Sequence, residues 1–150
     1  MEGDDVRNID HFNLCVGQVL GECFESFPVR IDFEFEAVGQ KVFDDYVAGS
    51  AGDSPYDPAE CSRYAAATID WLTDAGYIWV GRKINSEVLA VTLTPKSLEL
   101  LSAMPVSLKE NKSVGSVLAS ETKTLGREGV LELVRVVLAA GAKYAFSGNI

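Results

Sequence analysis

The sequence predicts an α+β protein in which helices pack around a small antiparallel sheet. Residues 8–27 repeat apolar side chains with the ~3.6-residue period of an amphipathic helix. Residues 29–38 alternate apolar and polar side chains, as a half-buried strand does. After Gly76 the spacing changes from helical to strand-like, and two β-rich runs predict a hairpin. With 150 residues, 47% of them hydrophobic, the chain can form one domain with its own core.

The N-terminal helix is the clearest element. Pro28 is expected to end it, because proline cannot donate a helical hydrogen bond. A strand follows over residues 29–38, with an acidic outer face that could bind a metal only beside further carboxylates. A short helix is expected at residues 40–48 and a loop at residues 49–58. The apolar face of the first helix consists of Ile9, Phe12, Cys15, Val16, Val19, Leu20, Cys23, Phe24 and Phe27.

A second long helix is expected to end near Ala75. Asp57 is its predicted N-cap, and Pro58 occupies the first helical position. Gly76 is the predicted C-terminal stop, because glycine adopts the left-handed conformation without strain. The apolar side of this helix consists of Cys61, Tyr64, Ala65, Thr68, Ile69, Leu72 and Ala75.

The hairpin is predicted from two β-rich runs, residues 77–80 and residues 88–93. Gly81, Asn85 and Ser86 are the predicted turn-forming residues between them. Such a hairpin would bury the alternate apolar side chains of both strands against the two long helices.

Three further segments follow the hairpin. Thr94 and Pro95 begin a short helix, and Pro105 ends it. Residues 106–128 show weak periodicity and are expected to be a linker or a weakly structured segment, with room for a short helix. Residues 129–146 predict a last helix that is apolar on most sides.

The charge of the chain is strongly asymmetric. The formal net charge is −9, and residues 1–59 carry 13 Asp and Glu against 3 Lys and Arg. An acidic surface repels nucleic acids and anionic membranes at long range, which argues against a general polyanion-binding protein. The same acidic N-terminal face is a candidate contact surface for a protein partner.

The cysteines predict buried free thiols rather than a disulfide framework or a zinc site. Cys15, Cys23 and Cys61 form no Cys-x-x-Cys pair, and His11 is the only histidine. We interpret His11 as a surface or capping residue, and we expect no metal or other cofactor. The acidic, polar N-terminus does not resemble a signal peptide, so a cytoplasmic location is expected.

Residues 65–101, AAATIDWLTDAGYIWVGRKINSEVLAVTLTPKSLELL, resemble the winged helix-turn-helix superfamily. In that family a helix ends in a phrase similar to TIDWLTDAGYI, a hairpin forms the wing, and a helix similar to LTPKSLELL closes the unit. Ser97 occupies a position where the family usually has glycine. Trp71 and Trp79 are interpreted as core or wing-packing residues. The implied division is a winged-helix-like domain at residues 1–105, the linker or weakly structured segment at 106–128, and a C-terminal apolar helix at 129–150.

The resemblance implies a DNA-binding transcriptional regulator that acts as an oligomer. The helix before the wing would enter the major groove of double-stranded DNA. Its outward face also carries the carboxylates of Asp70 and Asp74, which a polyanion would repel. A protein–protein interaction module of the same fold, without DNA binding or catalysis, is therefore kept as the alternative. The predicted DNA contacts are Arg63, Arg82, Lys83 and Lys96.

Catalysis is not expected from the sequence motifs. The chain contains no Gly-x-Gly-x-x-Gly, P-loop, Gly-x-Ser-x-Gly or His-Glu-x-x-His motif.

The last helix could pack on its own domain, pair with a second copy as in a homodimer, or contact a membrane. A membrane span is not expected, because charged residues interrupt the apolar run. The predicted oligomerisation residues, at coiled-coil-like spacing, are Val130, Val134, Val137 and Gly141.

Overall fold

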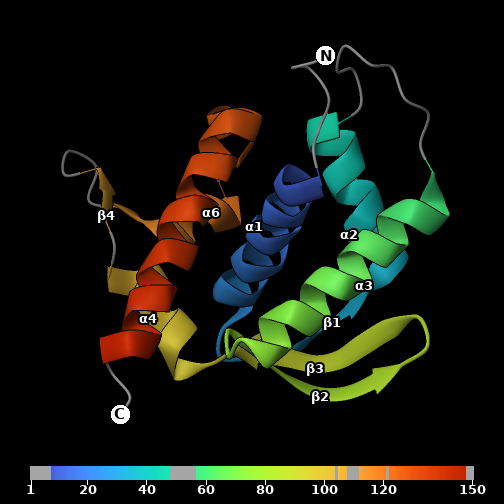
Figure 1. Ribbon diagram of the computed structural model, residues 1–150, viewed down its shortest axis with the longest axis horizontal. Helices are drawn as coiled ribbons and strands as arrows, with labels where there is room; N and C mark the ends of the chain where they lie inside the picture. Colours follow the sequence, from blue (N-terminus) through green and yellow to red (C-terminus); the bar gives the residue numbers. More distant parts are fainter. Residues whose placement is uncertain (1–7, 48–56, 104, 108–111, 121, 148–150) are drawn as a thin grey trace.

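The protein has a mixed α+β fold, as the sequence predicts, in which a group of helices packs beside a three-stranded antiparallel sheet (Figure 1). The computed structural model describes residues 8–47, 57–103, 105–107, 112–120 and 122–147. The elements are α1 (Asn8–Ser26), β1 (Ile31–Glu34), α2 (Phe35–Val42), the π-helical turn η1 (Phe43–Val47), α3 (Pro58–Asp74), β2 (Ile78–Ile84), β3 (Glu87–Leu93), α4 (Pro95–Ala103), β4 (Pro105–Ser107), β5 (Lys112–Ser113), α5 (Val114–Ser120) and α6 (Thr122–Ser147).

Helix α1 is the centre of the fold. It lies between α6 on one side and α2 and α3 on the other, with the sheet at one end of the helices (Figure 1). Small residues on α1 let its neighbours approach closely: a Cβ at Gly17 would meet Val130 at 3.1 Å, and one at Gly21 would meet the backbone of Leu118. The fully buried large side chains that form the core include Leu14, Leu20, Ile69, Leu72, Ile78, Leu93, Leu101 and Leu131.

The predicted strand at residues 29–38 is only half correct. Strand β1 ends at Glu34, and α2 begins at Phe35. Phe35, Val38, Gly39 and Val42 are all buried and have the i, i+3, i+4, i+7 spacing of a helix. The alternating pattern and the helical pattern overlap at this point, and the helical one determines the structure beyond Glu34. The expected helix at 40–48 is therefore the end of α2 and the turn η1.

Helix α3 begins and ends as predicted. The Asp57 side chain accepts a hydrogen bond from the backbone N–H of Glu60 at 3.3 Å, with Pro58 at the first helical position. Gly76 adopts φ +83°, and the backbone N–H of Tyr77 donates to the carbonyl of Leu72 at 2.8 Å. This is the hydrogen bond of a Schellman motif, which turns the chain sharply from α3 into the sheet.

The sheet has the strand order β1–β3–β2, with both pairs antiparallel. The hairpin is tighter than predicted, because Ile84 pairs with Glu87 and only Asn85 and Ser86 form the turn. Gly81 was expected in that turn but lies within β2. A Cβ at Gly81 would lie 2.8 Å from the Cβ of Ala90 on the neighbouring strand, so the strands approach closely there.

Ala90 lies at a bulge of β3 against β1, between the buried Val88 and Val91. It has φ +58°, and the pairing register with β1 shifts across it, between Ile31 and Phe33, while the register with β2 stays constant. Side chains of the first-strand region bind its backbone, since Asp32 Oδ1 accepts from its N–H at 3.0 Å and Arg30 donates to its carbonyl at 3.1 Å. On the other side of β3, Lys83 pairs opposite the buried Val88 and reaches Asp70 of α3.

The C-terminal third packs onto α1. The region predicted as a linker contains α5, in which Val114, Val117 and Leu118 are buried. Helix α6 begins before the expected residue 129, and Gly126 (φ 77°, ψ 177°) breaks it near its start. Thr94 accepts a hydrogen bond from the backbone N–H of Ser97 and so caps α4, as predicted.

Candidate macromolecular interface

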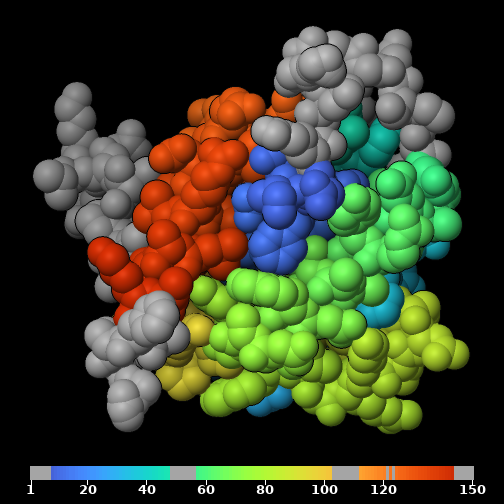
Figure 2. Space-filling view, in the orientation of Figure 1, coloured from blue at the N-terminus to red at the C-terminus, as the bar shows by residue number. Residues whose placement is uncertain are grey.

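Helix α3 lies at the surface and presents one side to solvent. Its inner side is buried through residues such as Ile69 and Leu72. In the space-filling view the helix forms much of the right-hand face, between α1 and the hairpin (Figure 2). The outer side carries one stripe of exposed residues, which we call the α3 face: Glu60, Arg63, Ala67, Trp71 and Asp74.

Two of the four predicted DNA-contacting cations form contacts within the chain. Lys83 Nζ lies 3.0 and 3.1 Å from the two carboxylate oxygens of Asp70 on α3. Both side chains are about half exposed, so the pair contributes at most about 1 kcal/mol to stability. Arg63 is exposed on the α3 face, and Arg82 is exposed on the hairpin.

The fourth predicted DNA contact, Lys96, lies on α4 but caps the C-terminus of α3. Its Nζ donates to the carbonyl of Ala75 at 2.8 Å and lies 4.2 Å from the ring centroid of Tyr77. A cation at this position satisfies a terminal carbonyl and interacts favourably with the negative end of the helix dipole. Burial lowers the pKa of the Lys96 ammonium. These contacts leave Lys96 less accessible to a phosphate than the sequence suggests.

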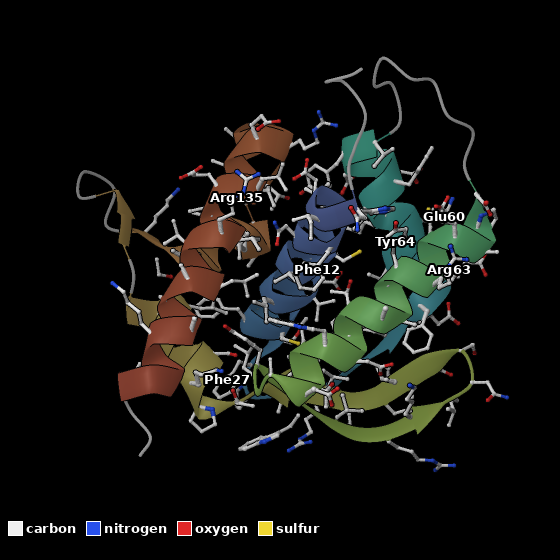
Figure 3. The ribbon with its side chains drawn as sticks, viewed as in Figure 1. Phe12, Phe27, Glu60, Arg63, Tyr64 and Arg135 are labelled. Carbon is white, nitrogen blue, oxygen red and sulfur yellow. The ribbon has the colours of Figure 1, made fainter. Side chains whose placement is uncertain are left out.

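An aromatic cluster lies beside the α3 face. Trp71 stacks on Tyr77 at 5.9 Å between ring centroids and meets the edge of Phe12 at 5.2 Å. Its indole is nevertheless 44% exposed, and Trp79 on β2 is 51% exposed. Of the two predicted roles, core or wing packing, the core role is therefore wrong for both tryptophans. The α1 and α3 side chains of this region, including Phe12 and Tyr64, lie on the same side of the molecule (Figure 3).

His11 belongs to the packing between α1 and α3. Its ring stacks on Tyr64 at 4.5 Å, and its Nε2 is buried without a hydrogen-bond partner among the described residues. Burial lowers the pKa of the imidazole, and the carboxylate of Glu60 opposes this only in part. The ring is therefore neutral near pH 7, and its surroundings are those of a packing residue.

The cysteines are not activated thiols, and the described residues form no metal-binding group. All three cysteines are free and buried, and burial raises the pKa of Cys15 and of Cys23 to about 12. Such thiols are poor nucleophiles because the thiolate is scarce at neutral pH. Within the described ranges, no group of three or more His, Cys, Asp or Glu side chains could hold a metal ion.

The predicted oligomerisation residues lie in the core of the chain. Val130, Val134 and Val137 are at most 1% exposed, and the first two approach Gly17 of α1. Gly141 lies against the hydroxyl of Tyr77. These four residues thus form the contact of α6 with its own domain. A narrow stripe of valines suits either packing within the chain or pairing with a second copy, and the sequence alone does not distinguish these two roles.

Comparison with protein-family models, with curated proteins and with solved structures gave no match. In the described part of the chain, no helix is both long and apolar enough to cross a membrane.

Proposed function

We propose that this protein is a binding module of the winged-helix type that recognises another protein through the α3 face. The element order, helix–strand–helix–helix–hairpin–helix, is the order from which the resemblance was drawn. The short β1 pairs with the hairpin as the first strand of a wing sheet would. Helix α3 then corresponds to the recognition helix of a DNA-binding relative.

The exposed Trp71 is the observation that carries the proposal. Tryptophan is enriched in the energetically dominant centres of protein interfaces, because one side chain buries a large area with little loss of rotamer freedom. Trp71 lies on the exposed side of a rigid helix, held by Tyr77 and Phe12. Ala67, one turn earlier, leaves room for a partner side chain beside the indole.

The charges of this surface favour a protein over DNA. The α3 face carries Glu60 and Asp74 against Arg63, and Asp70 already holds Lys83. DNA-binding proteins usually direct several cations at phosphates, and each contact adds to the salt dependence of binding. DNA binding remains the second candidate, because Arg82 is exposed on the hairpin where a wing would meet the backbone.

A photoreactive amino acid at Ala67 would test the proposal in cells. We expect crosslinks to one protein that disappear in the Trp71→Ala variant and persist in Trp79→Ala. The same photoreactive residue at Ala37, exposed on α2, is the positional control. Crosslinks that do not depend on Trp71 would contradict the proposal.

The DNA alternative has its own test. Binding to a mixed duplex DNA pool would be measured at low salt and again as salt is raised. If DNA binding weakens steeply as salt is raised and is also lost in Arg82→Glu, the result would support the DNA alternative and count against the protein-binding proposal. No binding at low salt would eliminate the DNA alternative.

A further inference from the structure

We infer that the partner segment is basic: it presents Lys or Arg to the carboxylates of α3 and an apolar or aromatic side chain to Trp71. This inference rests on the proposed function and adds the chemistry of the partner. It follows from where the charges of α3 lie, from what each of them does within the fold, and from the charge of the whole chain.

Helix α3 carries more carboxylates than cations. Its N-cap and its helical residues include four carboxylates, and Arg63 is the one cation between residues 57 and 74. Lys83 balances Asp70, so the remaining carboxylates lie toward the two ends of the helix, with the ammonium of Lys96 beside the C-terminal end. A docked segment of opposite charge could contact both ends while its centre covers Trp71. The four carboxylates are those of Asp57, Glu60, Asp70 and Asp74.

The fold explains the N-terminal carboxylates but not Asp74. Asp57 caps the helix, and both Asp57 and Glu60 face the positive end of the helix dipole. Asp74 is exposed in the last turn, where α3 has no basic residue of its own and Lys96 of α4 donates to the carbonyl of Ala75. A carboxylate at a helix C-terminus opposes the dipole. Because Lys96 already serves the Ala75 carbonyl, the exposed carboxylate of Asp74 is left to meet a partner cation.

Trp71 suits the same partner chemistry. Indole is the best aromatic acceptor of a cation–π interaction, and the stem of Arg or Lys also packs on apolar surface. The chain has a net charge of −9, so it attracts basic proteins at long range and repels acidic ones. A basic partner therefore fits both the local contacts and the overall field.

Selection from a random dodecapeptide phage library on the purified full chain tests the inference. Binders would be counter-selected on Trp71→Ala, so that only peptides that need the indole remain. We expect the survivors to be enriched in Lys and Arg together with one aromatic or aliphatic residue. The best peptide should lose at least tenfold in affinity on Trp71→Ala and none on Trp79→Ala.

Charge variants test the electrostatic part. Glu60→Gln/Asp74→Asn should weaken the peptide at least threefold and reduce its salt dependence. The control Glu36→Gln/Asp44→Asn removes two exposed carboxylates from α2 and η1 and should change neither. Urea unfolding of Asp74→Asn alone separates weaker binding from a loss of stability: weaker binding at unchanged stability supports the electrostatic contact.

The outcomes separate the two proposals. Trp71-dependent peptides that are neutral or acidic would overturn the basic partner and leave the proposed function intact. An equal effect of the two charge variants would also overturn it, because binding would then reflect net charge alone. A library that yields no Trp71-dependent peptide would count against the α3 face as a protein-binding surface, and the inference would fail with it.

Discussion

At the scale of single residues, Tyr77 connects the α3 face to the C-terminal helix. Its ring stacks on Trp71, lies under Lys96 and reaches Gly141 of α6 with its hydroxyl group. The absence of a side chain at Gly141 is what lets the tyrosine fit. The burial that results raises the pKa of the Tyr77 phenol.

Gly141→Ala should destabilise the protein by about 1–3 kcal/mol, the usual cost of overpacking a core. The new Cβ would collide with the hydroxyl of Tyr77 and lie 2.8 Å from its Cζ. Urea unfolding monitored by circular dichroism measures the change. Adding Tyr77→Phe removes the colliding oxygen and should recover much of the loss. If the double variant is no more stable than Gly141→Ala, the contact is not the cause.

His11 should make stability depend on pH near neutrality. Because burial lowers its folded-state pKa, the unfolded chain binds more protons below the ordinary histidine pKa of about 6.5. Stability should therefore fall as the pH decreases from 7.5 to 5.5, above the range in which most carboxylates titrate. Unfolding free energies of the wild type and His11→Gln measure this. A slope that persists unchanged in the variant would exclude His11 as its source.

At the scale of elements, β3 carries a bulge against β1 at Ala90. Alanine in the left-handed region costs about 1–3 kcal/mol, and here Asp32 and Arg30 hold it in place. The pairing register of β3 with β2 is constant past this point, and Lys83 of β2 reaches Asp70 of α3.

Ala90→Gly should stabilise the protein by up to about 1 kcal/mol, because glycine relieves the backbone strain but costs conformational entropy. Gly81→Ala should destabilise it by about 1–3 kcal/mol through the 2.8 Å contact with the Ala90 Cβ. Combining the two substitutions removes that contact, so their effects should not add. Additive unfolding free energies in this cycle would contradict the proposed coupling.

Sequence patterns predicted the elements with strong local signals and missed those set by tertiary contacts. Proline, glycine and capping residues located both ends of α3 because their effects are local. The boundary at Phe35 was missed because one run of residues satisfies both strand and helix periods. The bulge, the contacts of Lys83 and Lys96, and the exposure of Trp71 depend on residues distant in sequence. No local pattern could reveal these features of the candidate interface.

At the scale of the whole molecule, charge rather than shape restricts the partners. Most of the acidic excess lies in the N-terminal 59 residues, which include exposed carboxylates on β1, α2 and η1. Among the described residues, the surface ion pairs that offset it are exposed and individually weak. The folded state should therefore be destabilised by its own negative charge, because folding brings these carboxylates closer together.

Raising NaCl from 20 to 300 mM should therefore stabilise the protein by a few tenths of a kcal/mol, on the order of exposed-pair energies. Salt shortens the range of repulsion from roughly 20 Å to roughly 6 Å, which weakens the many like-charge interactions more than the few close pairs. Urea midpoints at constant pH measure the effect. Glu36→Gln/Asp44→Asn should show a smaller dependence, since two of the repelling charges are gone. A decrease in stability with salt would mean that ion pairs such as Lys83–Asp70 dominate. The acidic surface would then be an internally balanced one, and long-range attraction of a basic partner would lose its physical basis.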